Sequence, residues 1–298
     1  MSSITVIGGI KGKITVNTAE QLMAGQQNPA DISAAYTGTG RNIAENLARM
    51  GADAALVAAA GNDFIGKASI AELSKLGVDT ESVHLIDGKN TAMSIEILNI
   101  INDLVFAVDN GDVYECLNEE IISEVMDSLN ASKIVAADGS LGKEVLKYLS
   151  EKVTVPLFFD PHTEEDAKKV KDFIGAFDMI KPNRAEASAL CGKEIFSEEQ
   201  LKEAGQWFAD QGVKRVFITM SGGGVYYKEG EVEGILRPEQ VLPFANEEGA
   251  GDAFSAALLD GTVKGMNIEE LAAYGMKAAA VAMECRCAVN PEMSSERL

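Results

Sequence analysis

Histidine is scarce in this 298-residue chain, which has only His84 and His162. Two histidines are too few for a His-rich metal site, and they disfavour a mechanism that needs a histidine pair. Cysteine adds little, because the four cysteines are scattered apart from Cys285 and Cys287. A lone Cys-x-Cys without a second pair at zinc spacing is a weak metal signal. We therefore expect all four to be reduced structural thiols in a reducing cytosol.

Long hydrophobic runs and positive charge are missing as well. The first residues, MSSITVIGG, reach glycine too soon for a signal peptide, and the apolar stretch 278–283 is too short to cross a bilayer. Lysine and arginine total 26 against 46 aspartates and glutamates, which gives a formal net charge of −20. Such a surface repels polyanions, so any anionic ligand must be captured by local groups. The sequence indicates a soluble, cytoplasmic protein that binds neither nucleic acid nor membrane.

The chain does contain an alternation of apolar, β-branched runs with helical patterns. Strands are predicted at 4–7, 55–60, 133–137, 155–159, 179–181 and 216–220. Helices are predicted at 42–50, 65–76, 144–152, 167–173 and 198–210. This alternation predicts a single α/β domain over 1–298, with a mostly parallel central sheet covered by helices.

Two segments interrupt the alternation. Residues 13–16 and 91–114 are rich in β-forming residues and show no helix start. Because they are far apart in sequence, we expect them to meet as a small antiparallel sheet beside the main domain. This sheet would form a lid from about 12–36 and 91–115.

The most informative segment is GAGDAF at 249–254, which a helical run follows at 255–264. Small residues let the backbone approach a ligand, and the first turn of a helix presents unpaired N–H groups with a favourable dipole. That suits the charge of a transferring phosphoryl group, and Asp252 within the turn could accept the proton of an attacking hydroxyl. The alternative is a purely structural turn, which is the commoner role of Gly-x-Gly before a helix.

Five segments, in order along nearly the whole chain, resemble the signatures of the pfkB family of ribokinase-like carbohydrate kinases. They are TGTGRNIAENLARMG at 37–51, GNDFIG at 61–66, KPNRAEA at 181–187, SGGGVYY at 221–227 and GAGDAF at 249–254. Five ordered matches are far more specific than any single one. The resemblance implies a three-layer α/β fold and ATP-dependent phosphorylation of a sugar or nucleoside.

The resemblance also implies roles for the residues around the acceptor hydroxyl. Asp252 would be the general base. The anion hole would be formed by the amides of Gly249, Ala250 and Gly251. The acceptor side of the cleft would be formed by Gly38, Gly40 and Asn42. Alternatively, Gly38 and Gly40 are ordinary turn glycines.

ATP and Mg²⁺ are the cofactors that the resemblance implies, and many members of the family also depend on a monovalent cation such as K⁺. The residues implied on this side are Asn183, Glu186, Ser221, Gly223 and Asn290. Asn183 and Glu186 would position Mg²⁺ and phosphate through bound water, while Ser221 and Gly223 would line the nucleotide. Asn183 followed three residues later by Glu186 is also a capping-box pattern, which is the alternative.

Within the family, the resemblance extends to the pseudouridine kinases. It rests on GRNIAENLA at 40–48, FFDPHT at 158–163, IKPNRAEASALCG at 180–192 and the tail at 283–291. Asp109 and Asn110 lie where those enzymes have an Asn/Asp-rich lid segment, and such groups could read the edge of a uracil ring. The alternative for this pair is a polar hairpin turn.

Three departures from the family pattern keep other functions open. Lys13 stands where the family has an aspartate for sugar hydroxyls, Thr37 replaces a glycine, and NEE at 246–248 replaces a Thr-rich segment. A cation cannot accept hydrogen bonds from a diol, so one alternative is another sugar kinase, including one whose anionic acceptor is held by Lys11 or Lys13. The other is a non-catalytic relative that binds nucleoside, because carboxylates beside a phosphate site raise its negative charge and could also alter K⁺ dependence.

The predicted lid has a partly apolar face. Its candidate residues are Ile95, Ile97, Val105 and Phe106. An apolar sheet face favours pairing with a second copy, so we expect a homodimer formed through the lids.

Overall fold

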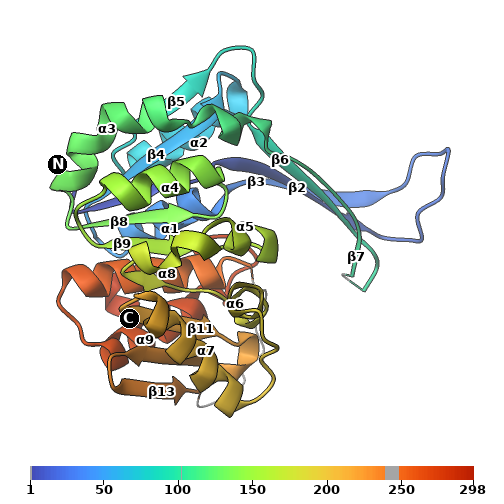
Figure 1. Ribbon diagram of the computed structural model, residues 1–298. Coiled ribbons are helices and arrows are strands. Elements are labelled where there is room, and N and C mark those ends of the chain that lie inside the picture. The colour runs from blue at the N-terminus through green and yellow to red at the C-terminus, as the bar shows by residue number, and fades with distance from the viewer. Residues whose placement is uncertain (1, 102, 239–247) are drawn as a thin grey trace.

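The computed structural model describes residues 2–101, 103–238 and 248–298, and its centre is a large sheet (Figure 1). In these residues the sheet has nine strands, in the order β13 (Val232–Leu236), β12 (Val225–Glu229), β11 (Arg215–Thr219), β10 (Met179–Ile180), β9 (Leu157–Asp160), β8 (Ile134–Asp138), β1 (Ile4–Ile7), β4 (Ala54–Gly61) and β5 (Val83–Ile86). From β11 to β5 every pair is parallel, whereas β12 pairs antiparallel with both β11 and β13. The predicted mostly parallel sheet is confirmed.

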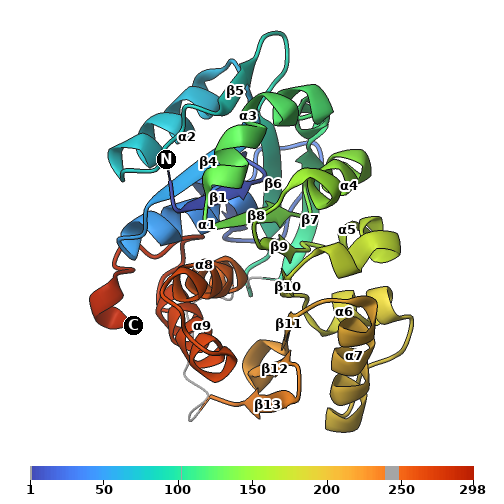
Figure 2. The same cartoon turned by 60° about the vertical axis from the view of Figure 1, so that its left-hand side comes forward.

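Helices cover both faces of this sheet (Figure 2). One face packs against α1 (Thr39–Arg49), α2 (Phe64–Lys75), α8 (Ala250–Val263) and α9 (Ile268–Ala282). The other packs against α3 (Glu119–Ala131), α4 (Lys143–Lys152), α5 (Glu164–Lys169), α6 (Arg184–Cys191) and α7 (Glu198–Gln211). Alternate side chains of β1 serve the two layers: Val6 lies in the core with α1 and α8, and Ile7 lies in the core with α3 to α7. The fold is therefore the three-layer α/β arrangement that the sequence predicted.

A second, small sheet projects from one end of the large one (Figure 1). Its strand order is β3 (Ala30–Thr37), β2 (Lys11–Thr18), β6 (Ala92–Leu98) and β7 (Leu104–Asn110). The outer pairs are antiparallel, but β2 and β6 run parallel, so the prediction of an antiparallel sheet is wrong for this central pair. The reason is that β2 follows β1 and β6 follows β5, and these two parallel strands end at the same edge of the large sheet.

The two faces of the small sheet differ in chemistry. Strand pairing places Lys11, Lys13, Ser94, Glu96 and Asp109 on one face, which we call the polar face. The opposite, apolar face has Ile14, Ile32, Ile95, Ile97, Phe106 and Val108. Phe106 and Val108 are 60% and 65% exposed. Val105 precedes Phe106 on the strand and so points to the other side, unlike the other predicted members of the apolar face.

Most differences from the predicted elements are local. The helix predicted at 167–173 ends at Lys169, and a 3-10 turn (Lys171–Ala176) follows in which Phe173 has a non-helical φ of −138°. Helices α3 and α9 and strands β5, β12 and β13 were not predicted, and β3 was expected only as part of the lid. Asn118 caps α3 by accepting a hydrogen bond from the Ile121 N–H at 3.1 Å. A 3-10 turn, Asp112–Cys116, closes the second β-rich segment. Within the described ranges, no helix combines the length and the apolar character that a membrane span needs.

Candidate active site

Helix α8 begins at a tight bend on Gly249. This residue has a φ of 75°, and a Cβ there would collide with the carbonyl oxygen of Ala288, so only glycine fits. The Ala253 N–H donates to the Gly249 carbonyl at 2.9 Å, which starts the helix. The amides of Ala250 and Gly251 come earlier in the turn, where N–H groups have no intrahelical acceptor and the helix dipole is positive. The bend can therefore present main-chain donors to an anion.

Asp252 lies in this first turn and contacts α1. Its Oδ2 accepts a hydrogen bond from Asn42 Nδ2 at 2.7 Å, and the same amide nitrogen donates to Thr37 Oγ1 at 3.1 Å. Withdrawal from water raises the pKa of Asp252 to about 7; the bond from Asn42 lowers it, and the nearby charge of Asp160 raises it. A carboxyl with this pKa can accept a proton at neutral pH.

The oxygen end of the Asn42 amide is unsatisfied. Among the residues that the structure describes, Asn42 Oδ1 is buried and accepts no hydrogen bond. Buried polar atoms normally have partners, so this oxygen is free to accept from a hydroxyl. Because the nitrogen of the same amide holds Asp252, such a hydroxyl would lie beside the carboxylate.

Gly38 and Gly40 let the start of α1 approach the end of β1. Gly38 has a φ of 111°, and a Cβ there would collide with the carbonyl oxygen of Gly9. Asp138, at the end of β8, secures this approach, because its Oδ2 accepts the amides of Gly9 at 2.9 Å and Gly40 at 2.7 Å. Both glycines therefore serve locally as turn residues, as in the alternative interpretation. Sequence reasoning missed Asp138, whose one signal is its place at the carboxyl end of a buried strand.

Lys181 was also missed as a site residue. It follows β10, and its Nζ lies 3.0 Å from Asp160 Oδ1 and 3.4 Å from the position a Cβ would take at Gly251. Asp160 also accepts from Ser255 Oγ at 2.5 Å. Burial lowers the pKa of Lys181, but the charges of Asp160 and Glu186 raise it above its ordinary value overall. A buried ammonium therefore lies against the α8 bend, and the Lys-Pro-Asn run was the signal that could have identified it.

Asn183 and Glu186 form the capping box of α6, as the structural alternative predicted. Asn183 Oδ1 accepts the Glu186 N–H at 2.9 Å, Glu186 Oε2 accepts the Asn183 N–H at 2.7 Å, and Asn183 Nδ2 donates to Glu186 Oε1 at 2.8 Å. Burial raises the pKa of Glu186 to about 7, although the charge of Lys181 lowers it. Carboxylate oxygens have further lone pairs, so this cap can also hold water on a metal ion.

Ser221 and Gly223 bound a 3-10 turn, η3 (Ser221–Gly223), directly after β11. Ser221 has a φ of 50°, in the left-handed region that residues other than glycine rarely adopt. Backbone strain of this kind clusters at functional sites. Because β10 and β11 are parallel, η3 lies at the same edge of the sheet as Lys181.

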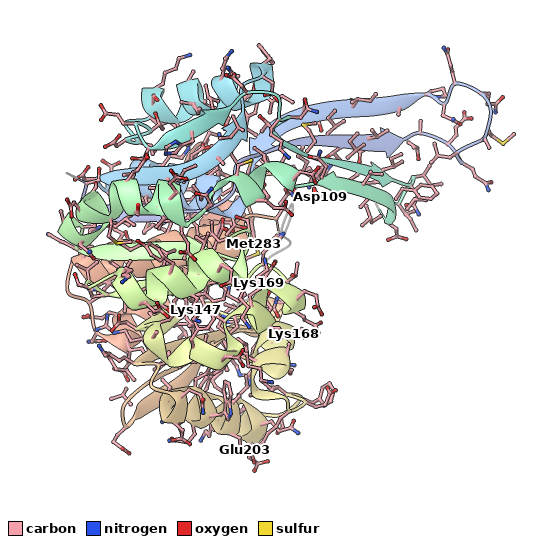
Figure 3. The ribbon with its side chains drawn as sticks, turned by 45° about the horizontal axis from the view of Figure 1, so that its top comes forward. Asp109, Lys147, Lys168, Lys169, Glu203 and Met283 are labelled. Atoms are coloured by element: carbon pink, nitrogen blue, oxygen red, sulfur yellow. A yellow bond between two sulfur atoms is a disulfide. The ribbon has the colours of Figure 1, made fainter. Side chains whose placement is uncertain are left out.

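Asp109 and Asn110 end strand β7 where the small sheet joins the body of the molecule. Asp109 Oδ2 pairs with Lys11 Nζ at 2.9 Å on the polar face, and Figure 3 labels its side chain near this junction. Asn110 pairs with Met93 across the strands and so points to the opposite face. The two predicted readers of a base therefore do not face the same side.

Lys13 reaches from the polar face to the residue just before the α8 bend. Its Nζ is 2.9 Å from Glu248 Oε2 and 2.9 Å from Glu96 Oε2. Burial lowers the pKa of Lys13, but the hydrogen bonds and charges of these glutamates raise it above the ordinary value overall. Two of the departures from the family pattern are thus partners of each other. Asn246 and Glu247 lie outside the described residues.

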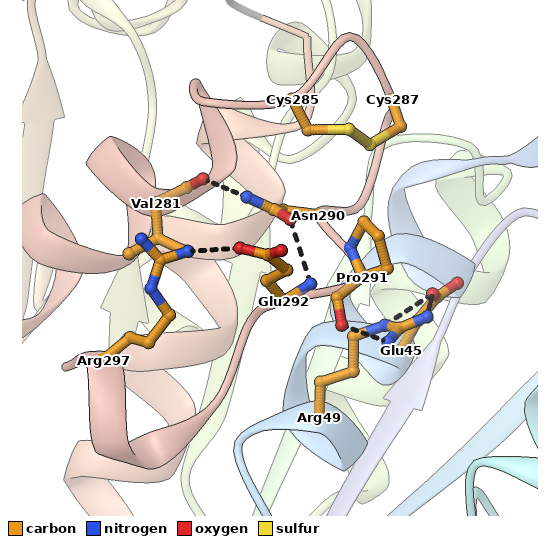
Figure 4. The surroundings of a disulfide bond; sticks show 9 residues. All are labelled: Glu45, Arg49, Val281, Cys285, Cys287, Asn290, Pro291, Glu292 and Arg297. Atoms are coloured by element: carbon orange, nitrogen blue, oxygen red, sulfur yellow. Dashed lines mark hydrogen bonds and ion pairs between the residues drawn. A yellow bond between two sulfur atoms is a disulfide. The ribbon is translucent and has the colours of Figure 1, made fainter.

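The tail after α9 contacts the bend through Ala288, and Figure 4 shows the hydrogen bonds of Asn290 and the disulfide in this tail. Asn290 Nδ2 donates to the Val281 carbonyl at 2.7 Å, and Asn290 Oδ1 accepts the Glu292 N–H at 3.0 Å, so both ends of this amide are used within the tail. Cys285 and Cys287 form a disulfide, so the expectation of reduced thiols is wrong for this pair. Their Cα atoms are 5.3 Å apart, within the usual disulfide range. Cys116 and Cys191 are free thiols.

The groups that approach one another follow the carboxyl ends of neighbouring parallel strands. Asp138 ends β8, Asp160 ends β9, and Lys181 follows β10. Ligands of open α/β sheets bind at this edge. The arrangement joins main-chain anion donors, a buried cation and a carboxylate of raised pKa, which together suit phosphoryl transfer to a hydroxyl.

Comparison with known proteins agrees with this chemistry. Residues 1–294 match the family described as pfkB family carbohydrate kinase. Over 292 residues the chain is 28% identical to the pseudouridine kinase of Escherichia coli (strain K12), covering 98% of this chain and 93% of the relative. It is 27% identical to the guanosine-inosine kinase of Exiguobacterium acetylicum, covering 94% of each. The structure of Arabidopsis thaliana ribokinase complexed with ribose and ATP matches with a TM-score of 0.88 at 21% identity, covering 99% of this chain and 97% of that one.

Proposed function

Because this chain belongs to the pfkB family of carbohydrate kinases, we propose that it transfers the γ-phosphoryl group of ATP to the 5′-hydroxyl of pseudouridine. Family membership makes the chain an ATP-dependent kinase of a sugar or nucleoside, with ATP and Mg²⁺ as its cofactors. The nucleoside acceptor is supported by the similarity to a pseudouridine kinase and to a guanosine-inosine kinase. The contact between Asn42 and Asp252 is the observation on which the chemistry rests.

In the proposed reaction, Asp252 is the general base. A neighbouring hydroxyl of the acceptor can donate to Asn42 Oδ1, while the 5′-hydroxyl donates to the Asp252 carboxylate, which takes its proton as the oxygen attacks the γ-phosphorus. The new bond is oxygen to phosphorus, and the bond to the bridging oxygen of ADP breaks. The amides of Gly249, Ala250 and Gly251 stabilise the charge on the transferring group.

The residues present fit ATP and Mg²⁺. A close backbone bend at Gly249 and a buried ammonium at Lys181 are suited to phosphate oxygens. Asn183 and Glu186 would hold Mg²⁺ through water, and Ser221 and Gly223 would line the nucleotide. When bound, Mg²⁺ neutralises charge on the phosphates. Asn290 would act indirectly, by holding the tail that contacts Gly249.

A neutral acceptor is favoured over an anionic one by the state of Lys13. Its ammonium already has two carboxylates at 2.9 Å, so its charge is already compensated. An anionic acceptor would have to displace one of them. Pseudouridine is neutral and keeps two ring N–H donors, because its base is joined to ribose through carbon. We propose that Asp109, which is on the polar face, accepts from one of these donors, rather than Asn110 on the other face.

An ADP-release assay with a panel of acceptors tests the proposal. We expect turnover with pseudouridine and at least about tenfold lower kcat/KM with uridine, ribose and sugar phosphates. Turnover only with sugar phosphates or sugar acids would contradict the nucleoside assignment. Tight nucleoside binding without ADP release would instead indicate a non-catalytic relative. The carboxylates in the segment 246–248 are the sequence feature that suggested this alternative.

The proposed assembly is a homodimer formed through the apolar faces of two small sheets. This face exposes large apolar side chains to water, namely Ile32, Phe106 and Val108, and such a patch favours contact with another protein surface. The proposed compartment is the cytoplasm, where disulfides are rare. The Cys285–Cys287 disulfide would be an exception to that rule. Cell fractionation with detection of this protein tests the compartment, and its recovery outside the cytoplasmic fraction would contradict the proposal.

A further inference from the structure

The Lys13–Glu248 ion pair connects two parts of the molecule that are far apart in sequence. Lys13 is on β2 of the small sheet, and Glu248 directly precedes Gly249 at the α8 bend. Their side chains are separated by 235 residues along the chain yet meet at 2.9 Å. A cavity of about 60 Å³ adjoins this contact, lined by residues of β2, β3 and the tail, including Thr15, Ser33 and Arg286.

This pair is better shielded from water than an ordinary surface pair. The Lys13 side chain is 13% exposed and that of Glu248 is 35% exposed, whereas the two partners in many surface pairs are both largely in water. Screening by salt is weaker at such partly buried sites. Solvent therefore weakens the attraction between these two charges less than it would in a fully exposed pair, and the pair links the bend to the small sheet.

The pair also removes a charge conflict at the bend. An unpaired carboxylate on Glu248, one residue before the proposed anion hole, would repel the triphosphate of ATP. Lys13 offsets the charge of that carboxylate, and Glu96 pairs with the same ammonium from within the small sheet. Lys13 cannot accept hydrogen bonds from a diol, but it can offset the charge of Glu248.

We propose that Lys13 is a positioning residue that fastens the small sheet to the phosphate-binding bend through Glu248, so that the acceptor side and the ATP side are coupled. This inference rests on the proposed function, since it takes the α8 bend as the place where ATP phosphates bind. It assigns to Lys13 no contact with the reacting atoms.

The first experiment compares Lys13→Met with Lys11→Met. Lys11 is on the same face of the same strand, and its ion pair with Asp109 has the same 2.9 Å length but stays within the small sheet. We expect Lys13→Met to raise KM for ATP and lower kcat by about 10-fold each, because the bend loses its partner and gains a free carboxylate. Lys11→Met should alter KM for the acceptor and leave KM for ATP unchanged. Equal changes of KM for ATP in the two variants would overturn the proposal.

The second experiment is a double-mutant cycle of Lys13→Met and Glu248→Gln, with Tm measured for each protein. If the two charges act as a pair, the double variant recovers most of the kcat and ATP affinity that Lys13→Met loses, because no unpaired carboxylate remains at the bend. Additive losses would overturn the coupling. Asp252→Asn serves as the separate check: if it keeps normal turnover, the proposed site itself is wrong, whatever the cycle shows.

Discussion

The α8 bend and the polar face of the small sheet meet at one end of the large sheet, but they are built in different ways. The bend uses main-chain amides and a glycine that is fixed by the Ala288 carbonyl. The polar face uses long charged side chains, such as Lys11 and Lys13, that are paired with carboxylates on other strands. Most side-chain substitutions leave main-chain donors in place, and only one that moves the backbone displaces them, whereas ion pairs can be rearranged one residue at a time. This difference suits the proposed arrangement, in which a fixed ATP site lies beside an acceptor site whose specificity can vary.

The largest effect on kcat is expected from Asp252→Asn, at the bend. We expect kcat to fall about 100-fold or more, since the amide cannot accept the hydroxyl proton, while ATP binding persists. The matched control is Asp260→Asn in the same helix, where a buried carboxylate accepts from Tyr274 Oη at 2.7 Å. That variant should lower Tm but keep turnover. Near-normal kcat in Asp252→Asn would show that the base lies elsewhere.

Gly249→Ala tests whether the bend itself matters. The new Cβ would meet the Ala288 carbonyl, so we expect kcat to fall about 10-fold or more as the amides are displaced. Gly265→Ala is the control, because Gly265 has a similar φ of 79° and no atom within 4 Å of a Cβ. It should cost only about 1 kcal/mol of stability for the backbone strain. Equal kcat in the two variants would contradict the assignment of an anion hole at Gly249.

The pH dependence of kcat/KM tests whether Asp252, the carboxylate of the bend, is the group that titrates. Asp252 must be ionised to accept a proton, and its pKa is raised to about 7, so kcat/KM should fall as pH decreases through about 7. The bond from Asn42 lowers this pKa, so Asn42→Ala should move the acid limb to higher pH. Stopped-flow or coupled assays over this range measure the shift. A limb that stays in place in Asn42→Ala would argue against Asp252 as the titrating group.

The smallest expected effect on catalysis comes from the apolar face of the small sheet. Phe106→Glu should dissociate the proposed homodimer, as measured by light scattering, and change kcat by less than about threefold, since this face points away from the polar one. Phe196→Glu is the control: this residue is 75% exposed and lies before α7 in the main body. A monomer for the unmodified protein, or an equal effect of both variants, would contradict the assembly.

The bend could be predicted from sequence because its information is local. The segment GAGDAF contains the glycines, the carboxylate and the start of the helix within six consecutive residues, and the structure places them in one turn. The mostly parallel sheet was predictable for the same reason, since each strand and helix has its own apolar pattern. The fold class and the family follow from such local patterns in a fixed order.

The contacts that join distant segments could not be predicted in this way. Asp138 binds the amides of Gly9 and Gly40, but nothing near residue 138 indicates which backbone it will meet. The parallel pairing of β2 with β6 depends on where β1 and β5 end in the large sheet. The meeting of Lys13 with Glu248 depends on both the small sheet and the tail. Each of these is a property of the topology and not of any one segment.

The contact between Gly249 and Ala288 has a consequence for the order in which a ribosome delivers the chain. The glycines near residue 8 emerge first, and the residue that braces the phosphate bend emerges only after almost forty more residues than the bend itself. A nascent or proteolytically shortened chain that lacks residue 288 would have the strands of the proposed acceptor side but no support for the bend that we propose binds phosphate. Such fragments should be unable to hydrolyse ATP unproductively, because that bend is completed last.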